Sequence, residues 1–115
     1  MNIEVINLEE GRPTLEEALE RLSDYIAFAR KNGARVAKLI HGYGSSGTGG
    51  TIKKALKGEL NRYIKQKLIL GYVYGEDWNI FNETARKITD AYPQTKNDKD
   101  FCKSNHGITI VLVKL

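Results

Sequence analysis

The chain has 115 residues, of which 41% are hydrophobic and 28% charged, a length and composition typical of one globular domain. This length excludes a two-domain enzyme and a complete dinucleotide-binding fold, and the single Cys102 excludes an internal disulfide. No apolar stretch reaches the ~18 residues of a membrane span, and the N-terminal residues lack the pattern of a secretion signal. We therefore expect a single domain over residues 1–115, in a reducing cytoplasm and with no membrane partner.

The net charge of +4 is distributed unevenly along the chain. Residues 1–29 carry two basic and seven acidic side chains, residues 30–70 carry ten basic and one acidic, and residues 71–115 carry six of each. A basic middle third gives one face of a folded domain a positive potential, which attracts phosphate groups. A lysine-rich helix face that is merely solvated produces the same pattern, so the charge alone leaves both interpretations open.

The first half of the chain predicts a strand, a helix and a second strand. Residues 3–8 are rich in β-branched side chains, and turn residues follow them. Thr14 and Glu17 have the spacing of a capping box, after which apolar residues recur at helical spacing up to the stop at Gly33. Residues 36–40 are almost entirely apolar, as in a strand covered by helices. This order predicts a parallel crossover connection.

The second half predicts two more helices and two more strands. Thr51 is the expected N-cap of a helix with a buried stripe of Ile52, Leu56, Leu60 and Ile64. Residues 68–74 and 108–113 have strand composition. Between them, Asp77 is the expected cap of a helix that ends before Pro93 and faces inward with Ile80, Phe81, Thr84, Ala85, Ile88 and Ala91. The aromatic residues expected in the core, rather than on a base-stacking surface, are Trp78, Phe81 and Tyr92.

A glycine-rich segment separates the second strand from the second helix. Half of the residues from 41 to 50 are glycine, which leaves backbone amides free to hold a phosphate at the positive end of a helix dipole. A P-loop is excluded because Thr48 and Gly49 follow Gly47, where that motif requires Lys and then Ser or Thr. The spacing of the glycines also matches a dinucleotide-binding fingerprint. However, helical periodicity begins too late for that fold, and the acidic residue expected about 20 positions further on is missing.

The loop and the helix after it supply the candidate phosphate-binding residues. Lysines in the first turns of a helix oppose its dipole unless an anion is bound nearby. The candidates are the loop residues Gly42, Tyr43, Gly44, Gly47, Gly49 and Gly50 and the helix residues Lys53, Lys54 and Lys57. The Tyr43 ring either stacks on a base or sugar or lies over the helix. His41 either donates to a phosphate and transfers a proton, or holds the loop through hydrogen bonds.

Three segments together resemble one known family. Leu39-Ile40-His41-Gly42-Tyr43-Gly44, the further glycines and Ile52-Lys53 resemble the His-Gly-x-Gly signature of the small MutS-related (Smr) domain. Residues 14–19 resemble the start of that family's first helix, and residues 107–111 resemble its closing strand. The resemblance covers residues 6–64 and 107–115. It implies a compact two-layer α/β sandwich with a mixed sheet, in which a segment at about 75–106 is a helical insertion that typical members lack.

The same resemblance implies that the chain binds or cleaves DNA or RNA, with the ribosome or another protein as a further partner. Family members carry Leu-Asp-x-His at the end of the first strand, whereas this chain has Asn7 in the position of the Asp and Glu9 in that of the His. A neutral amide neither accepts a proton nor ligates a metal as a carboxylate does. The candidate catalytic residues of an endonuclease are therefore His41 and Glu9, and a divalent metal is left open as a cofactor.

Three functions stay open on this basis. They are an endonuclease acting on phosphodiester bonds, a nucleic-acid or ribosome-associated binding module without catalysis, and a domain that binds a small nucleotide or phosphate, since loop amides hold a phosphate whatever carries it. We rank nucleic-acid binding above cleavage because of Asn7. Cys102 and His106, with His41, form too small a set for a zinc site, so no metal ligand is assigned.

Overall fold

The computed structural model describes residues 3–42 and 49–115. The elements in chain order are β1 (Glu4–Asn7), α1 (Leu15–Lys31), β2 (Val36–Ile40), α2 (Gly49–Lys65), β3 (Gly71–Tyr74), the 3-10 turn η1 (Gly75–Asp77), α3 (Glu83–Ala91), the 3-10 turn η2 (Pro93–Asn97) and β4 (Ile108–Leu112). None of the helices described combines the length and the apolar character that crossing a membrane requires.

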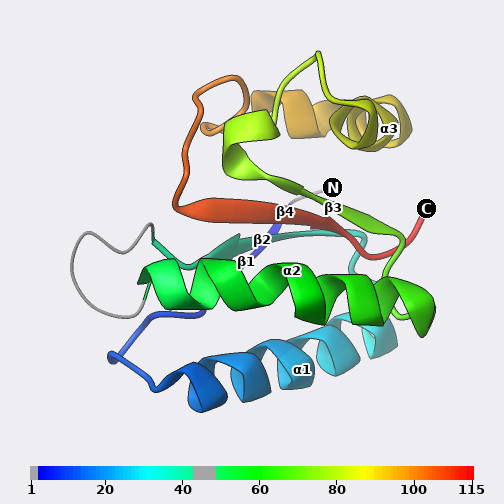
Figure 1. The fold of residues 1–115 in the computed structure, drawn as a ribbon. Coiled ribbons are helices and arrows are strands. Elements are labelled where there is room, and N and C mark those ends of the chain that lie inside the picture. Colours follow the sequence, from blue (N-terminus) through cyan, green and yellow to red (C-terminus); the bar gives the residue numbers. More distant parts are fainter. Residues whose placement is uncertain (1–2, 43–48) are drawn as a thin grey trace.

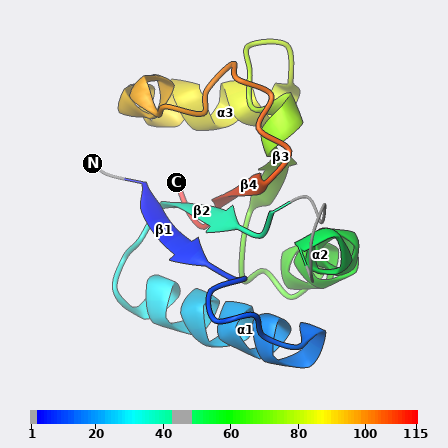
Figure 2. The same cartoon turned by 90° about the vertical axis from the view of Figure 1, so that its left-hand side faces the viewer.

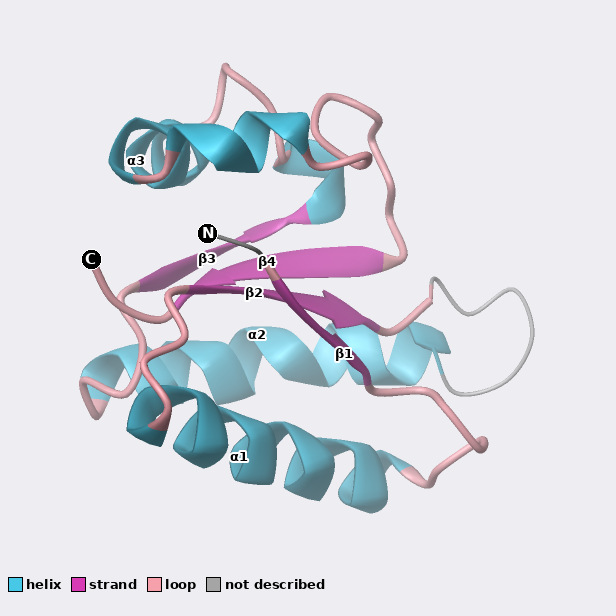
Figure 3. Ribbon diagram, turned by 180° about the vertical axis from the view of Figure 1, so that it is seen from behind, coloured by secondary structure: helices cyan, strands magenta, loops and turns pink. Residues whose placement is uncertain are grey.

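The four strands form one mixed sheet in the order β1-β2-β4-β3. β1 pairs with β2 in parallel, as the crossover through α1 predicts, and β4 is antiparallel to both of its neighbours. β1, β2 and β3 therefore run in one direction and end at the same edge of the sheet, where β4 begins. Figure 3 shows the arrowheads of β1 and β2 at this edge, beside the start of α2.

The helices cover both faces of the sheet. α1 and α2 lie side by side on one face, and α3 with η2 covers the other (Figures 1 and 2). Side chains of the central strands alternate between two core clusters, so that Leu39 and Val111 pack toward α1 and α2, whereas Val36 and Ile110 pack toward α3. The predicted α/β class with a mixed sheet is confirmed. The sheet with α1 and α2 forms the two expected layers, and the segment after β3 adds cover on the opposite face.

The predicted start of the third helix is wrong. Asp77 belongs to η1, and α3 begins six residues later at Glu83, where the Asn82 side chain accepts a hydrogen bond from the Ala85 amide at 3.0 Å. Phe81 is 84% exposed instead of buried, and Ile80 and Ala91 are exposed as well. The Asn79 side chain accepts a hydrogen bond from the Phe81 amide and so stabilises a turn at this point. Such local hydrogen bonds compete with helix formation. Trp78, in contrast, is buried as predicted.

The second helix also differs in detail from its prediction. α2 already begins at Gly49, so Thr51 lies within the helix and is not its cap. Ile52, Leu56 and Leu60 are buried as expected, but the next inward position is Tyr63, which is 4% exposed, and Ile64 faces outward. Both residues lie about one turn beyond Leu60, and the larger aromatic ring fills the space between α1 and α2. β3 begins at residue 71 instead of 68, after a turn with positive φ at Lys67.

Candidate nucleic-acid interface

Three strand ends and the start of α2 lie at a single edge of the sheet. β1, β2 and β3 end there, β4 begins there, and α2 has its first turn alongside. Open α/β sheets commonly bind ligands outside the carboxyl ends of their strands, and a helix start adds a positive dipole end. We call this region the strand-end edge. It comprises residues 7–9, 41–42, 49–57, 74–76 and 105–107.

His41 leaves β2 with its side chain fully buried. Its Nδ1 lies 2.7 Å from the carbonyl oxygen of Gly42, and its Nε2 lies 2.9 Å from the hydroxyl of Thr109 on β4. Burial is the largest influence on the ring and lowers the pKa of His41, with the nearby Lys53 charge acting in the same direction. The ring is therefore neutral near pH 7 and both of its nitrogens are hydrogen-bonded within the protein, which favours the loop-holding interpretation of the two left open above.

Gly42 and Glu9 lie against each other at the mouth of the loop. Gly42 has a φ of +70°, and a Cβ at this position would lie 2.5 Å from a carboxylate oxygen of Glu9. The positive φ favours glycine here, and a larger residue would also require the Glu9 carboxylate to move. The Glu9 amide donates to Oδ1 of Asn7 at 3.0 Å, which closes a turn directly after β1. Asn7 thus shapes the turn that carries Glu9.

Lys53 points from the first turns of α2 toward the chain that leaves β3. Its ammonium donates to both carboxylate oxygens of Glu76, at 2.8 and 3.0 Å, and to the carbonyl oxygen of His106 at 3.1 Å. Burial by itself raises the pKa of Glu76, but the hydrogen bonds and charge of Lys53 outweigh burial and hold that pKa below its ordinary value. The predicted phosphate ligand Lys53 therefore already has an anionic partner within the protein.

The segment that enters β4 is attached to the end of β2. The amides of His41 and Gly42 both donate to the carbonyl oxygen of Gly107, at 2.9 and 3.0 Å. The Gly107 amide in turn donates to the side chain of Asn105 at 2.9 Å. These bonds bring His106 to the strand-end edge, where its Nδ1 lies 3.5 Å from Glu76 Oε2. Its ring is 58% exposed.

The other candidate phosphate ligands divide into two groups. Lys54 and Lys57 project from α2 and are exposed, and Gly49 and Gly50 form the first turn of that helix. Tyr43, Gly44 and Gly47 lie outside the described residues. The structure places Glu9, His41, Gly42 and Lys53 near one another and near the start of α2.

Glu76 and His106 belong to the same edge, but the sequence interpretation did not assign them to it. Glu76 lies two residues after the end of β3, so the rule that strand ends carry functional side chains could have identified it. His106 is near the edge only because β4 runs antiparallel and starts there, and nothing local in the sequence indicates that pairing. Within residues 3–42 and 49–115, no three His, Cys, Asp or Glu side chains gather as a metal-binding group.

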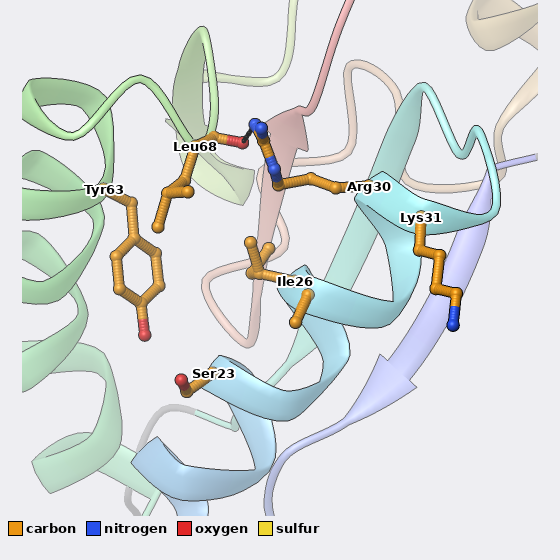
Figure 4. Close-up of a pocket in the computed structure, with 7 residues that line it drawn as sticks. Ser23, Ile26, Arg30, Lys31, Tyr63 and Leu68 are labelled. Atoms are coloured by element: carbon orange, nitrogen blue, oxygen red, sulfur yellow. Dashed lines mark hydrogen bonds between the residues drawn. The ribbon is translucent and has the colours of Figure 1, made fainter.

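A separate groove lies between the last turns of α1 and α2. Ser23, Ile26, Arg30, Lys31, Tyr63 and Leu68 line it together with Ala27 (Figure 4). Arg30 donates to the carbonyl oxygens of Lys67 and Leu68, and the hydroxyl of Tyr63 has no partner among the described residues. Because α2 starts at the strand-end edge and runs for 17 residues, or about 25 Å, this groove lies at the opposite end of the molecule.

Comparison with known proteins agrees with this architecture. A family model described as the Smr domain matches residues 11–78. The crystal structure of the Smr domain of Thermus thermophilus MutS2 is similar to this chain with a TM-score of 0.60, over 98% of this chain and 100% of that one. The two sequences are 18% identical, so this likeness concerns the fold. No curated protein sequence matches the chain significantly.

Proposed function

Because this chain belongs to the Smr domain family, a module of nucleic-acid-binding or endonuclease type, we propose that it binds the sugar-phosphate backbone of a nucleic acid at the strand-end edge. The observation that carries this proposal is the charge at the start of α2. α1 has Glu16 and Glu17 in its first turn, as a helix dipole favours, whereas α2 has no acidic residue in its first turn and carries Lys53, Lys54 and Lys57 in its second and third turns.

Lys54 and Lys57 supply the cations of this interface. Both are exposed, and neither forms an ion pair among the described residues. A phosphate bound at the start of α2 would interact with the positive end of the helix dipole and with these lysines, which lie one to two turns further along the helix. Lys53 is bonded to Glu76 and so contributes less to binding than its two neighbours.

The neighbouring helix limits where a nucleic acid lies. The exposed face of α1 carries Glu16, Glu20 and Asp24, which repel phosphate groups. A polyanion is therefore guided to the α2 side of the strand-end edge. In this interpretation His41 is a positioning residue. Its ring forms hydrogen bonds with the Gly42 carbonyl and the Thr109 hydroxyl, and these bonds fix the start of the glycine-rich loop at the strand-end edge.

The double variant Lys54→Ala/Lys57→Ala tests the proposal. It should bind labelled structured RNA and duplex DNA on the order of tenfold more weakly than the wild type. The slope of log affinity against log salt should become shallower by about 2, because each lysine that is removed leaves one phosphate without its cation. Fluorescence anisotropy at several salt concentrations measures both quantities.

The matched control is Lys87→Ala/Lys96→Ala, which removes the same charge from the α3 side of the molecule, where both lysines are exposed. This control should retain nearly all of the affinity. Equal decreases in the two double variants would mean that only net charge matters and would contradict a site at the strand-end edge. If millimolar nucleotide raises the melting temperature and neither RNA nor DNA binds, the proposal of nucleic-acid binding is wrong and the domain binds a small phosphate compound instead.

A further inference from the structure

We propose that His106 is the catalytic base of an RNA-cleaving site at the strand-end edge, with its ring oriented by Glu76. The inference rests on the proposed function, because RNA must bind at this edge before His106 acts on it. The proton transfer is thereby assigned to residues near the end of β3 and the start of β4, and not to Asn7 or Glu9 at the end of β1.

The imidazole and the carboxylate have the arrangement of a base and its orienting group. Nδ1 of His106 lies 3.5 Å from Glu76 Oε2, which is ion-pair distance without a hydrogen bond, and the carboxylate charge favours a proton on the nearer ring nitrogen. Nε2 is then free to accept a proton, and the ring is 58% exposed, so a substrate reaches it. His41 differs on each point, since it is fully buried and both of its nitrogens are engaged.

Glu76 is itself fixed in position. Lys53 donates to both carboxylate oxygens of Glu76 and to the backbone carbonyl oxygen of His106. One ammonium therefore joins the Glu76 side chain to the backbone of His106. Gly75, just before Glu76, is so close to the Asn105 carbonyl that a Cβ there would overlap it. The chain that leaves β3 and the chain that enters β4 are therefore packed backbone against backbone, which holds Glu76 and His106 in register.

A surface hollow lies beside the ring. Its lining residues are Asp100, Lys103, Ser104, Asn105 and His106. Lys103 is exposed there and offers a cation to a phosphate, while the side chain of Asn105 is held by its bonds to Asp100 and Gly107. The proton acceptor and a cation for the reacting group thus line the same hollow.

The chemistry of an imidazole at this position favours RNA over DNA, because RNA carries its own nucleophile. Nε2 of His106 takes the proton of a ribose 2′-hydroxyl as that oxygen attacks the adjacent phosphorus. The O2′–P bond forms and the P–O5′ bond breaks, giving a 2′,3′-cyclic phosphate and a 5′ oxygen. The imidazolium returns its proton through solvent to that 5′ oxygen, so the base is regenerated and nothing is oxidised or reduced.

The test uses the full chain and an oligonucleotide with one ribonucleotide in a deoxy background, in the presence of chelator. The wild type should cut after the ribonucleotide and leave a cyclic phosphate, and the same oligonucleotide with a 2′-O-methyl group should stay intact. His106→Ala should bind equally but cut at least about 100-fold more slowly, the usual contribution of a positioned base. Added imidazole should restore part of the rate, and Lys87→Ala, on the α3 side, should cut like the wild type.

Glu76→Gln separates orientation from binding. Removing the carboxylate charge releases the Lys53 ammonium, so binding should tighten about two- to threefold, while cleavage at saturating RNA should slow about tenfold. Glu76→Asp should recover part of the rate. A purely structural role would not change binding and cleavage in opposite directions.

The outcomes separate the two proposals. RNA binding without cleavage by the wild type would overturn the role of His106 and leave the binding function standing. Cleavage that continues in His106→Ala, or that affects the 2′-O-methyl substrate equally, would also overturn it. The absence of RNA binding would overturn the proposed function itself.

Discussion

His41 is buried together with two hydrogen bonds that a neutral imidazole satisfies, one to the Gly42 carbonyl and one to the Thr109 hydroxyl. Burial lowers the pKa of this ring in the folded state from its ordinary value of 6.5. The unfolded chain binds a proton near pH 6.5, and the folded chain does so only at lower pH. The histidine therefore reduces stability as the pH falls below 6.5 and has no such effect above it.

We expect the melting temperature of the wild type to fall between pH 7 and pH 5, and that of His41→Gln to change much less over the same interval. The carboxyl groups of Glu76 and Asp100 also have lowered pKa values, but their loss of stability begins only near their ordinary values of 4.5 and 3.8. Differential scanning calorimetry across this pH range measures the effect. A fall of equal size in His41→Gln would show that other groups cause it.

At the scale of elements, the ends of the helices follow from short-range chemistry. The Thr14 hydroxyl accepts from the Glu17 amide at 3.1 Å and the Glu17 carboxylate accepts from the Thr14 amide at 2.9 Å, which is the predicted capping box. The hydrogen bond from the Thr14 amide is the largest influence that lowers the pKa of Glu17. α3 obeys the same rule with Asn82 as its cap, although the sequence offers Asp77 as an earlier alternative.

Thr14→Ala should destabilise the protein by about 1 kcal/mol, because the substitution removes the side-chain acceptor of the first turn. Urea denaturation monitored by circular dichroism measures the change. Glu20→Ala is a suitable control, since it alters an exposed position further along the same helix. A destabilisation of equal size in the control would mean that helix propensity or surface charge, and not capping, determines the result.

At the scale of the whole molecule, one buried cation joins the sheet to the segment after α3. Lys38 faces α3 from β2 and is almost fully buried, with its ammonium 2.6 Å from Asp98 and 2.5 Å from Asp100. The indole of Trp78 donates to Asp98 as well, at 3.2 Å. Burial raises the pKa of Asp100, but hydrogen bonds from Asn105 and Lys38 outweigh it and lower the pKa overall. The network holds the chain that continues to His106.

Lys38→Met should therefore destabilise the fold by about 3 kcal/mol or more, because two carboxylates lose their buried partner while the space stays filled. Lys87→Met, at an exposed site, should change stability by less than about 0.5 kcal/mol. Chemical denaturation of the two variants measures the difference. A similar small change in both would mean that Asp98 and Asp100 find other partners or bind protons at little cost.

Periodicity and composition predict most of the elements of this chain correctly. The strands at β1, β2 and β4, the parallel crossover through α1 and the buried stripe at Ile52, Leu56 and Leu60 are confirmed, because burial on one face imposes a pattern on the sequence. The start of α3 is not predicted, since apolar residues such as Phe81 suit a helix as well as an exposed turn. That residues 75–106 are an insertion relative to the family stays a prediction.

The sequence by itself determined the glycine-rich loop between β2 and α2, the basic first turns of α2 and the Smr signature, because each is a property of contiguous residues. Only the tertiary structure decided what lies around them. Antiparallel pairing of β4 brings His106 to the ends of β1, β2 and β3, and the end of β3 brings Glu76 to Lys53. Such pairings join residues that are far apart in the chain, and they depend on how the sheet packs between two layers of helices.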